Sequence, residues 1–203
     1  GTGQQKAAQG RTFVGNDMRL QLAFKLLAAL ALLASPLAAQ TWDETTQGGG
    51  DAGQTVAAVQ SVTGTGSLST ITGSLPTATD VDVYRIRIAN AANFSASTSG
   101  SIGTNDTVLY LFSATGAGIA QNDDLSASVY LSTLPIGDAL YNALPAGDYL
   151  IAVTRYYMYP SSSAGDIWNT GTAATTTINA PLNAGTFITW TQGTTFAANG
   201  SYS

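Results

Sequence analysis

Oxygen-bearing side chains gather at several points of the chain, each beside a stretch that reads as a β-strand. Carboxylate and amide oxygens are the ligands that hard cations such as Ca²⁺ prefer, in shells of about six to eight oxygens. The residues that we expect to supply such ligands are Asp80, Asp82, Asn105, Asp106, Asn122, Asp123 and Asp124. The chemistry predicted for them is calcium binding.

A second interpretation of the same residues needs no metal. Asp and Asn side chains accept hydrogen bonds from nearby backbone N–H groups and therefore favour turns at strand ends. The spacing also differs from that of an EF-hand, whose ligands alternate through one continuous loop that ends in Glu. The sequence leaves both interpretations open, a calcium site and ordinary solvated turns.

The larger acidic group lies at the two ends of a predicted hairpin. Val108, Tyr110 and Phe112 alternate with other apolar residues, which indicates a short strand buried on both faces. Gly116 and Gly118 follow where a hairpin turn needs positive φ, and an extended path then resumes. We therefore expect the acidic ends of this hairpin to lie close together.

A second strand pattern begins at Asp80 and runs to Ile88. Val81 and Val83 fall on one face, whereas the apolar residues from Tyr84 onward fall on the other, so the pattern shifts phase by one residue. A β-bulge near Val83 and Tyr84 would bring both groups to the same side. We predict such a bulge. Later in the chain, residues 138–144 are the one stretch whose pattern also allows a helix.

The N-terminal part has the features of an export signal. Met18 starts a basic stretch, an apolar run follows, and Pro36 and small residues up to Ala39 complete the tripartite pattern. We predict a signal peptide over residues 18–39, cleaved after Ala39, behind an upstream segment, residues 1–17, that is non-native or read from an untranslated region. A membrane anchor is the alternative, but the apolar run is about half of the roughly 20 residues that cross a bilayer. No membrane span is expected in the mature chain.

After that cleavage the chain keeps three basic and eleven acidic side chains, a net charge of −8. A surface of this sign is a poor partner for nucleic acid and for anionic membranes. The remaining chain also contains no His, Cys or Lys, which removes the usual general base, the thiol nucleophile and the Ser–Lys dyad. We therefore expect no enzymatic activity and no disulfide.

Aromatic residues follow the last strong strand pattern. Tyr156, Tyr157 and Tyr159, together with Trp168, combine apolar area with polar groups and form a candidate stacking face for sugar rings or a partner protein. The alternative is that these rings close one end of the core. An extracellular polysaccharide or protein is the partner that the first interpretation predicts.

Four motifs occur in an order that resembles a known family. They are Asp80-Val81-Asp82-Val83-Tyr84, the strand from Asp106 to Phe112 with Gly116, Asn122-Asp123-Asp124, and the segment from Leu144 through Gly147 and Tyr149 to Val153. Their order and spacing resemble the bacterial pre-peptidase C-terminal domain, over residues 73–155. The resemblance implies an antiparallel, jelly-roll-like β-sandwich on secreted or surface proteins, non-catalytic, with calcium-binding and polymer-binding members.

The short strand patterns and glycine-rich turns independently predict an all-β chain. We expect residues 40–203 to form a single β-sandwich domain, truncated at its C-terminus. Its expected role is that of a secreted or cell-surface module for binding or structure, stabilised by calcium. The alternative is an accessory domain of a secreted hydrolase whose catalytic part lies elsewhere.

Overall fold

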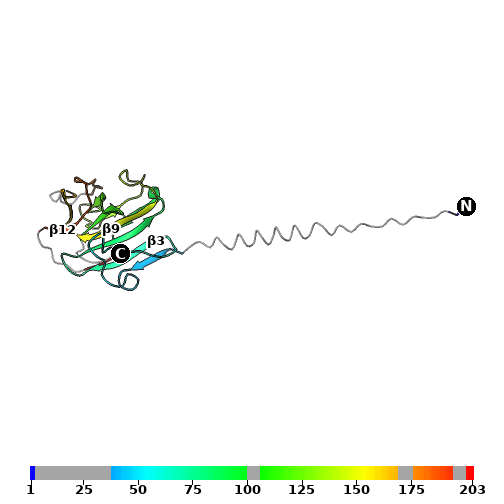
Figure 1. Cartoon of the computed structure of the whole chain (residues 1–203), viewed down its shortest axis with the longest axis horizontal. Coiled ribbons are helices and arrows are strands. Elements are labelled where there is room, and N and C mark those ends of the chain that lie inside the picture. The colour runs from blue at the N-terminus through cyan, green and yellow to red at the C-terminus, as the bar shows by residue number, and fades with distance from the viewer. Residues whose placement is uncertain (3–37, 100–105, 169–175, 194–199) are drawn as a thin grey trace. The chain divides into compact units, whose positions relative to one another are not determined.

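The computed structural model describes residues 1–2, 38–99, 106–168, 176–193 and 200–203. The chain divides into two units, residues 1–38 and 39–203, and every strand belongs to the second (Figure 1). Among the described residues there is no α-helix, and a 3₁₀ turn occurs at Ala91–Asn93. The all-β class predicted from the sequence is therefore confirmed.

The strands are short and numerous. In chain order they are β1 (Gln40–Asp43), β2 (Gln60–Ser61), β3 (Leu68–Leu75), β4 (Val81–Ile88), β5 (Ala96–Ser97), β6 (Thr107–Ser113), β7 (Gly118–Asn122), β8 (Thr133–Leu134), β9 (Gly147–Arg155), β10 (Met158–Ser162), β11 (Gly165–Asp166), β12 (Thr189–Gln192) and β13 (Gly200–Tyr202). They form four sheets, in the orders β2-β4-β9-β6-β7, β1-β3-β13, β11-β10-β12 and β5-β8. This arrangement is compatible with a β-sandwich.

The five-stranded sheet is the centre of the domain, and both of its faces are buried. Its strands pair antiparallel, except that β2 runs parallel to β4. Strand β4 pairs with β9 without interruption from Val81↔Thr154 to Ile88↔Gly147. The β-bulge predicted near Val83 and Tyr84 is therefore wrong. Because both faces are covered over most of β4, the two phases of apolar residues serve two different parts of the core.

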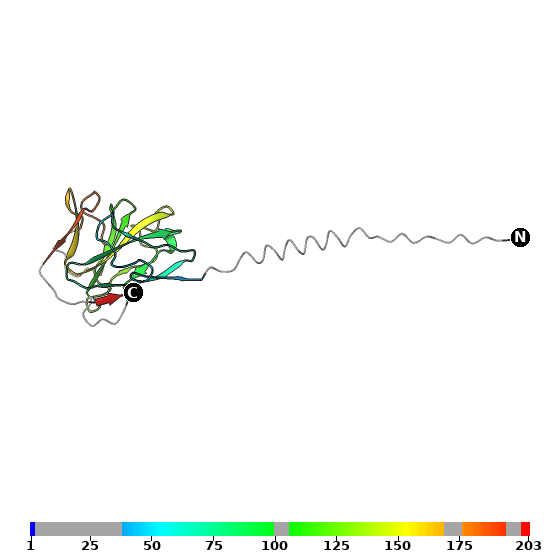
Figure 2. The same ribbon diagram turned by 60° about the horizontal axis from the view of Figure 1, so that its bottom comes forward.

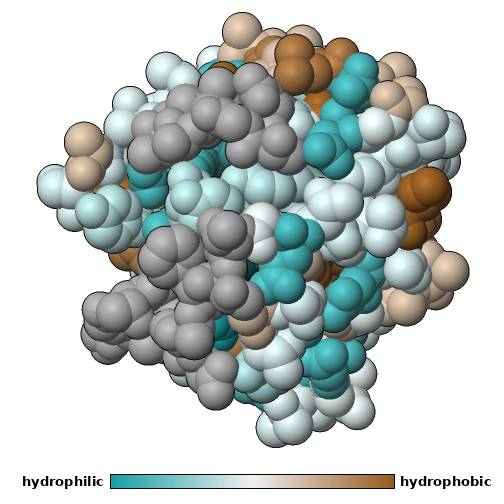
Figure 3. All heavy atoms as spheres, turned by 90° about the vertical axis from the view of Figure 1, so that its left-hand side faces the viewer, coloured by the Kyte–Doolittle hydropathy of each residue, from teal (hydrophilic) through white to brown (hydrophobic). Residues whose placement is uncertain are grey.

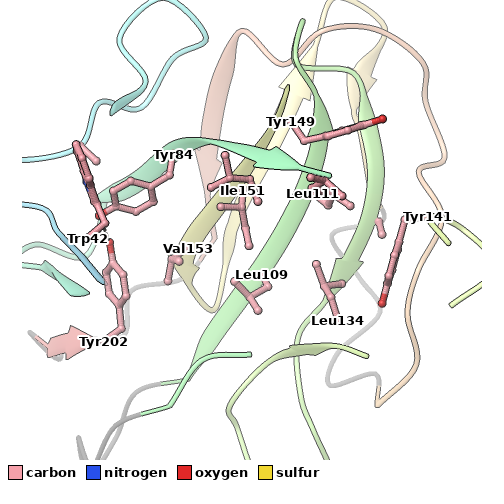
Figure 4. Packing of buried hydrophobic residues seen from close by; sticks show 14 of the residues in the cluster. Trp42, Tyr84, Leu109, Leu111, Leu134, Tyr141, Tyr149, Ile151, Val153 and Tyr202 are labelled. Carbon is pink, nitrogen blue, oxygen red and sulfur yellow. Dashed lines mark hydrogen bonds between the residues drawn. The ribbon is translucent and has the colours of Figure 1, made fainter. Parts of the chain in front are cut away.

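One face of this sheet packs against the layer that contains β1, β3 and β13. Tyr84 of β4 lies beside Trp42 of β1 and Tyr202 of β13, at one end of the cluster in Figure 4. At the other end are Leu134 and Tyr141. Strand β13, the red arrow beside the C-terminus in Figure 2, pairs antiparallel with β3, whereas β1 pairs parallel with it. The parallel pairs are a departure from the wholly antiparallel sandwich that we expected.

The opposite face is covered by aromatic residues from the later part of the chain. Phe112 of β6 lies 4.7 Å from Phe187 between ring centroids and 5.6 Å from Trp168. Tyr110 lies 5.2 Å from Trp168 and donates a 2.8 Å hydrogen bond to the backbone oxygen of Met158. These contacts dock the sheet β11-β10-β12 and its neighbouring loops onto the central sheet.

The hairpin of β6 and β7 forms as predicted, but Gly118, which we expected to have a positive φ, does not, and it is the first residue of β7. Six of the seven residues of β6 are buried, so this strand is covered on both faces. Gly116 has φ 87°, a conformation that the turn requires and that a side chain would strain. Residues 138–144 form successive turns instead of a helix, with the carboxylate of Asp138 accepting a hydrogen bond from the backbone N–H of Leu140. That local bond competes with helical hydrogen bonding.

The surface shown in Figure 3 is largely hydrophilic, and its hydrophobic residues are scattered instead of forming one broad patch. Scattered apolar residues are normal on a folded surface and need no partner. Among the described residues, no helix is long and apolar enough to cross a bilayer. The signal peptide predicted at residues 18–39 lies almost wholly outside the described residues.

Candidate cation sites

The β6–β7 hairpin brings three carboxylates together at its open end. Asp106 directly precedes β6, and Asp123 and Asp124 directly follow β7. Since Leu109 pairs with Asn122, the start of one strand and the end of the other lie side by side. One carboxylate oxygen from each of the three aspartates lies within 4.8 Å of the other two. We call Asp106, Asp123 and Asp124 the hairpin cluster.

The hairpin cluster is shielded from water. Asp123 is 3% exposed and Asp124 is 2% exposed, while Asp106 is half-buried. The Oδ1 atoms of Asp106 and Asp124 are buried and accept no hydrogen bond. A buried carboxylate oxygen without a partner loses its hydration and gains nothing in return, which destabilises the fold. A proton or a cation bound to these oxygens would remove this destabilisation.

Burial sets the protonation of this cluster. Burial, together with the negative charge of Asp124, raises the pKa of Asp106 to about 6. Burial also raises the pKa of Asp124. Near neutral pH the carboxylates must therefore ionise close to one another in a poorly hydrated place. A divalent cation between them would offset both the desolvation and the repulsion.

Asn122 holds the loop of the hairpin cluster in place. Its side chain is fully buried, its Oδ1 accepts a 2.7 Å hydrogen bond from Thr133 N–H, and its Nδ2 donates to the backbone oxygen of Asp124 at 3.2 Å. The structure thus gives this predicted ligand a positioning role, in which β8 and the acidic loop are tied to the end of β7. The predicted ligand Asn105 lies outside the described residues.

A second acidic group lies elsewhere in the domain. It consists of Glu44 after β1, Asp51 in the following loop, and Asp82 in β4, again with one carboxylate oxygen of each within 4.8 Å of the others. We call these three residues the β4 cluster. Glu44 is 3% exposed and Asp82 is fully buried, whereas Asp51 is exposed.

The two buried members of the β4 cluster are bound in different ways. Both oxygens of Glu44 accept backbone hydrogen bonds, Oε1 from Ala52 at 3.0 Å and Oε2 from Ser74 at 2.8 Å. Asp82 Oδ2 accepts a 2.6 Å hydrogen bond from the hydroxyl of Tyr202, but its Oδ1 accepts none. Glu44 is therefore fixed by the backbone, and Asp82 retains one acceptor without a partner.

The β4 cluster has the most perturbed acid of the site. Burial raises the pKa of Asp82 to about 9, an effect that the hydrogen bond from Tyr202 partly opposes and the charges of Glu44 and Asp80 reinforce. Burial likewise raises the pKa of Glu44 and of Asp80. Arg155 is the nearby base: its charge favours the ionised form of Asp80. The pKa of Arg155 is itself lowered by burial.

The six predicted ligands that the structure describes are thus divided between two places. Asp106, Asp123 and Asp124 come together in the hairpin cluster, whereas Asp82 joins the β4 cluster. Asp80 is buried beside the latter, where its Oδ1 accepts hydrogen bonds from Val81 N–H at 3.0 Å and Gln54 Nε2 at 3.4 Å. The division follows from the strand order, in which β9 lies between β4 and β6.

Sequence reasoning missed Glu44 and Asp51 as partners of Asp82. Glu44 reaches this position because β1 runs parallel to β3, and its backbone N–H donates a 2.9 Å hydrogen bond to Thr72 O beyond the last paired residues. A pairing between segments so far apart leaves no local pattern. One signal was present: Glu44 is the only glutamate in the sequence and directly follows Trp42 and Asp43.

The predicted aromatic face is partly present at the surface. Tyr156, Tyr157 and Tyr159 are half-buried, with ring centroids 3.8 Å apart for the first pair and 6.4 Å for the second. Trp168 is different, because it is 2% exposed and packs between core rings while its Nε1 donates to Asn179 O at 3.1 Å. We therefore assign Trp168 to the core and leave it out of any surface for ligands.

Both clusters fit a hard cation in the nature of their donors. All are oxygens, and each cluster contains an acid that is at least nine-tenths buried and has an oxygen without a hydrogen bond, Asp124 in one and Asp82 in the other. The hairpin cluster would hold the ion with three carboxylates, and the β4 cluster would add the backbone-fixed Glu44. Comparison of the chain with family models, with curated proteins and with solved structures found no match.

Proposed function

We propose that this protein is a secreted or cell-surface, non-catalytic β-sandwich module whose fold is stabilised by a bound calcium ion. The observation that carries the proposal is the hairpin cluster, in which three carboxylate oxygens lie within 4.8 Å of one another and the buried Oδ1 of Asp124 accepts no hydrogen bond. Calcium accepts a flexible shell of oxygen ligands, including carboxylates and backbone carbonyls. Water or backbone oxygens would complete it.

The position of the hairpin cluster explains how a cation would act on the fold. Its carboxylates flank two adjacent strands of the central sheet, β6 and β7, at the end where no turn connects them. Without a cation, like charges at this end oppose the pairing of the strands. With a cation, the same charges become ligands that hold the strands together. Binding free energy then adds to folding free energy.

The proposed architecture is a jelly-roll-like sandwich of the pre-peptidase C-terminal type. Support comes from the four motifs that resemble this family and from the places they occupy, since they fall on β4, β6, the end of β7 and β9, four strands of one sheet. The domain would serve binding or structure outside the cell. The proposed partners are an extracellular polysaccharide or a protein.

The proposal is tested by differential scanning calorimetry of the purified chain in excess chelator and in millimolar calcium. A site that binds only the folded state stabilises it by about 2.7 kcal/mol when the free ion is at 100 times its dissociation constant. We expect calcium to raise Tm, and magnesium to raise it less because Mg²⁺ requires a stricter octahedral shell. An identical Tm in calcium and in chelator would show that no cation stabilises the fold.

A matched pair of variants separates this site from general charge effects. The double variant Asp123→Asn/Asp124→Asn should lose the rise in Tm with calcium, while its stability in chelator should equal or exceed that of the parent because the repulsion is gone. Asp148→Asn is the control, because this aspartate is exposed and pairs only with Arg87 at 3.3 Å. The control should keep the full calcium response.

A further inference from the structure

A small pocket lies between β10, β12 and two loops, which contain residues 54–55 and 79. Its volume is about 210 Å³. Its lining consists of Gln54, Thr55, Thr79, Met158, Ile188, Thr189, Trp190 and Gln192. These residues are three threonines, two glutamines, a tryptophan, a methionine and an isoleucine, and none of them carries a charge. Thr55, Thr79, Ile188, Thr189 and Gln192 are exposed, so the pocket is open to solvent.

Trp190 is held in one orientation at this pocket. Its indole Nε1 donates a 2.7 Å hydrogen bond to the backbone oxygen of Gln54, which lines the same pocket. Its ring lies 5.5 Å from those of Tyr110 and Phe187 and 6.3 Å from that of Phe112. The indole is thus fixed by the core and still reaches the pocket. A preorganised ring loses little conformational entropy when a ligand stacks on it.

The polar groups around the indole are also positioned. Gln54 is tied to Asp80 through a 3.4 Å hydrogen bond from Nε2, which leaves its amide oriented. Thr189 and Gln192 sit on β12, whose register with β10 is fixed from Met158↔Gln192 to Ser161↔Thr189. This register holds the donors and acceptors of the β12 side chains at fixed positions along the strand.

A strained residue directly precedes the pocket. Tyr157 has φ 69°, the left-handed region that a bulky side chain rarely adopts, and Met158 of the pocket follows it. The backbone oxygen of Tyr157 accepts a 2.8 Å hydrogen bond from Gly193 N–H. A strained backbone persists only where the surrounding structure maintains it, and such residues cluster at ligand sites.

We propose that this pocket binds one ring of a neutral carbohydrate, with the sugar stacked on Trp190 and its hydroxyls bonded to Gln54 and Gln192. A pocket smaller than the roughly 300–1,000 Å³ of drug-sized sites suits a single ring. The absence of a charged lining side chain favours an uncharged ligand, and the net negative charge of the chain disfavours acidic polymers. The inference rests on the proposed role as a binding module, but it does not require the cation.

The test is retention of the purified chain on neutral polysaccharides. Cellulose, chitin, starch and mannan serve as probes, with alginate and polylysine as acidic and basic controls. We expect retention on at least one neutral polymer, and micromolar to millimolar affinity for its soluble oligosaccharide by titration calorimetry. Retention on none of the four neutral polymers, or only on a charged polymer, would overturn the inference.

Two variants locate the binding and avoid ambiguity from misfolding. Trp190→Ala should weaken binding at least about tenfold, as removal of a buried aromatic anchor does. Because Trp190 also contacts the core, the exposed Gln192→Ala is the second variant, and it should weaken binding severalfold without a change in the circular dichroism spectrum. Thr191→Ala, on the same strand but outside the pocket lining, is the control and should bind as the parent does.

The variants also decide between this inference and the proposed cation function. Equal affinity of the parent, Trp190→Ala and Gln192→Ala would place any sugar binding elsewhere and overturn the pocket assignment. The rise in Tm with calcium is recorded on the same samples. A calcium response without sugar binding rejects only the pocket, whereas sugar binding without a calcium response rejects only the cation site.

Discussion

The hydroxyl of Tyr202 donates a 2.6 Å hydrogen bond to the carboxylate of Asp82, a residue that precedes it by 120 positions and is fully buried. The same hydroxyl lies 2.5 Å from that of Tyr84. Burial and the charge of Asp82 raise the pKa of Tyr202 far above its ordinary value, so the phenol stays protonated and remains the donor. One oxygen of the buried acid of β4 is thus satisfied by a residue of β13.

Replacing Tyr202 by Phe should show how much this bond contributes. The variant keeps the ring in the core but leaves Asp82 Oδ2 without its donor, and an unsatisfied buried acceptor costs about 1–3 kcal/mol. Urea unfolding at pH 7 should therefore give a lower free energy of unfolding for Tyr202→Phe. Tyr130→Phe is the control, because Tyr130 is 54% exposed. An unchanged midpoint for Tyr202→Phe would mean that water or another group replaces the hydroxyl.

The free energy of unfolding of the cation-free protein should fall as pH rises, because the folded state binds protons on the two clusters more tightly than the unfolded state does. The folded-state pKa values of Asp106, about 6, and Asp82, about 9, both exceed the ordinary value of 3.8. Above pH 3.8 the unfolded chain releases these protons while the folded chain keeps them, so raising the pH favours unfolding. The effect of Asp106 should extend to about pH 6 and that of Asp82 to about pH 9.

Denaturant unfolding in chelator from pH 4 to pH 9 checks this sign. The free energy of unfolding of Asp82→Asn, measured relative to that of the parent, should increase as pH rises through that range, by at most about 1.4 kcal/mol per pH unit. For Asp106→Asn, the same relative free energy of unfolding should increase only between pH 4 and about pH 6. The groups that face Asp82 and shape its curve are Glu44, Asp51, Asp80, Tyr84 and Tyr202. A parent that becomes more stable relative to Asp82→Asn at high pH would contradict the assigned shift.

Asn122 should be as important to the hairpin cluster as the acids themselves. Asn122→Ala removes the hydrogen bonds to Thr133 and Asp124, and we expect a loss of about 1–3 kcal/mol together with a weaker calcium response. Asn183→Ala is the matched control, since Asn183 is exposed and its Nδ2 also donates to a backbone oxygen, that of Asp166. Equal calcium responses of the two variants would remove the positioning role of Asn122.

The aromatic rings packed around Phe112 should contribute much of the free energy of unfolding. Phe112 is fully buried and its ring contacts Tyr110, Trp168, Phe187 and Trp190. Phe112→Ala should cost about 3–5 kcal/mol in the free energy of unfolding, because it leaves a cavity between the sheet and its cover. Leu182→Ala, at a residue that is 67% exposed, should change stability by less than about 0.5 kcal/mol. Thermal unfolding of both variants gives the comparison.

The sequence was informative where neighbouring residues determine the structure. The alternation from Val108 to Phe112 and the turn at Gly116 predicted β6, its burial on both faces and the hairpin with β7. The closeness of Asp106 to Asp123 followed from that hairpin. All of these relations lie within about 20 residues of chain, where local hydrogen bonding and strand periodicity determine the geometry.

Relations between distant strands could not be predicted in this way. The bulge at Val83 was wrong because the pattern alone does not reveal that β4 is covered on both faces, and Asp82 was grouped with Asp106 because nothing in the sequence places β9 between β4 and β6. Glu44 joined Asp82 only through the parallel pairing of β1 with β3. Each of these errors depends on sheet order, which is a property of the whole domain.

Strand β3 receives β1 on one edge and β13 on the other, so a single sheet joins residue 40 to residue 202. During synthesis, therefore, one edge of β3 stays unpaired until residues 200–202 have left the ribosome. Contacts of such long sequence separation slow folding, because a large loop must close before they form. Pairing of β13 then closes this edge of β3. We expect the nascent chain to gain protease resistance late and abruptly, when Tyr202 reaches Asp82 and Tyr84.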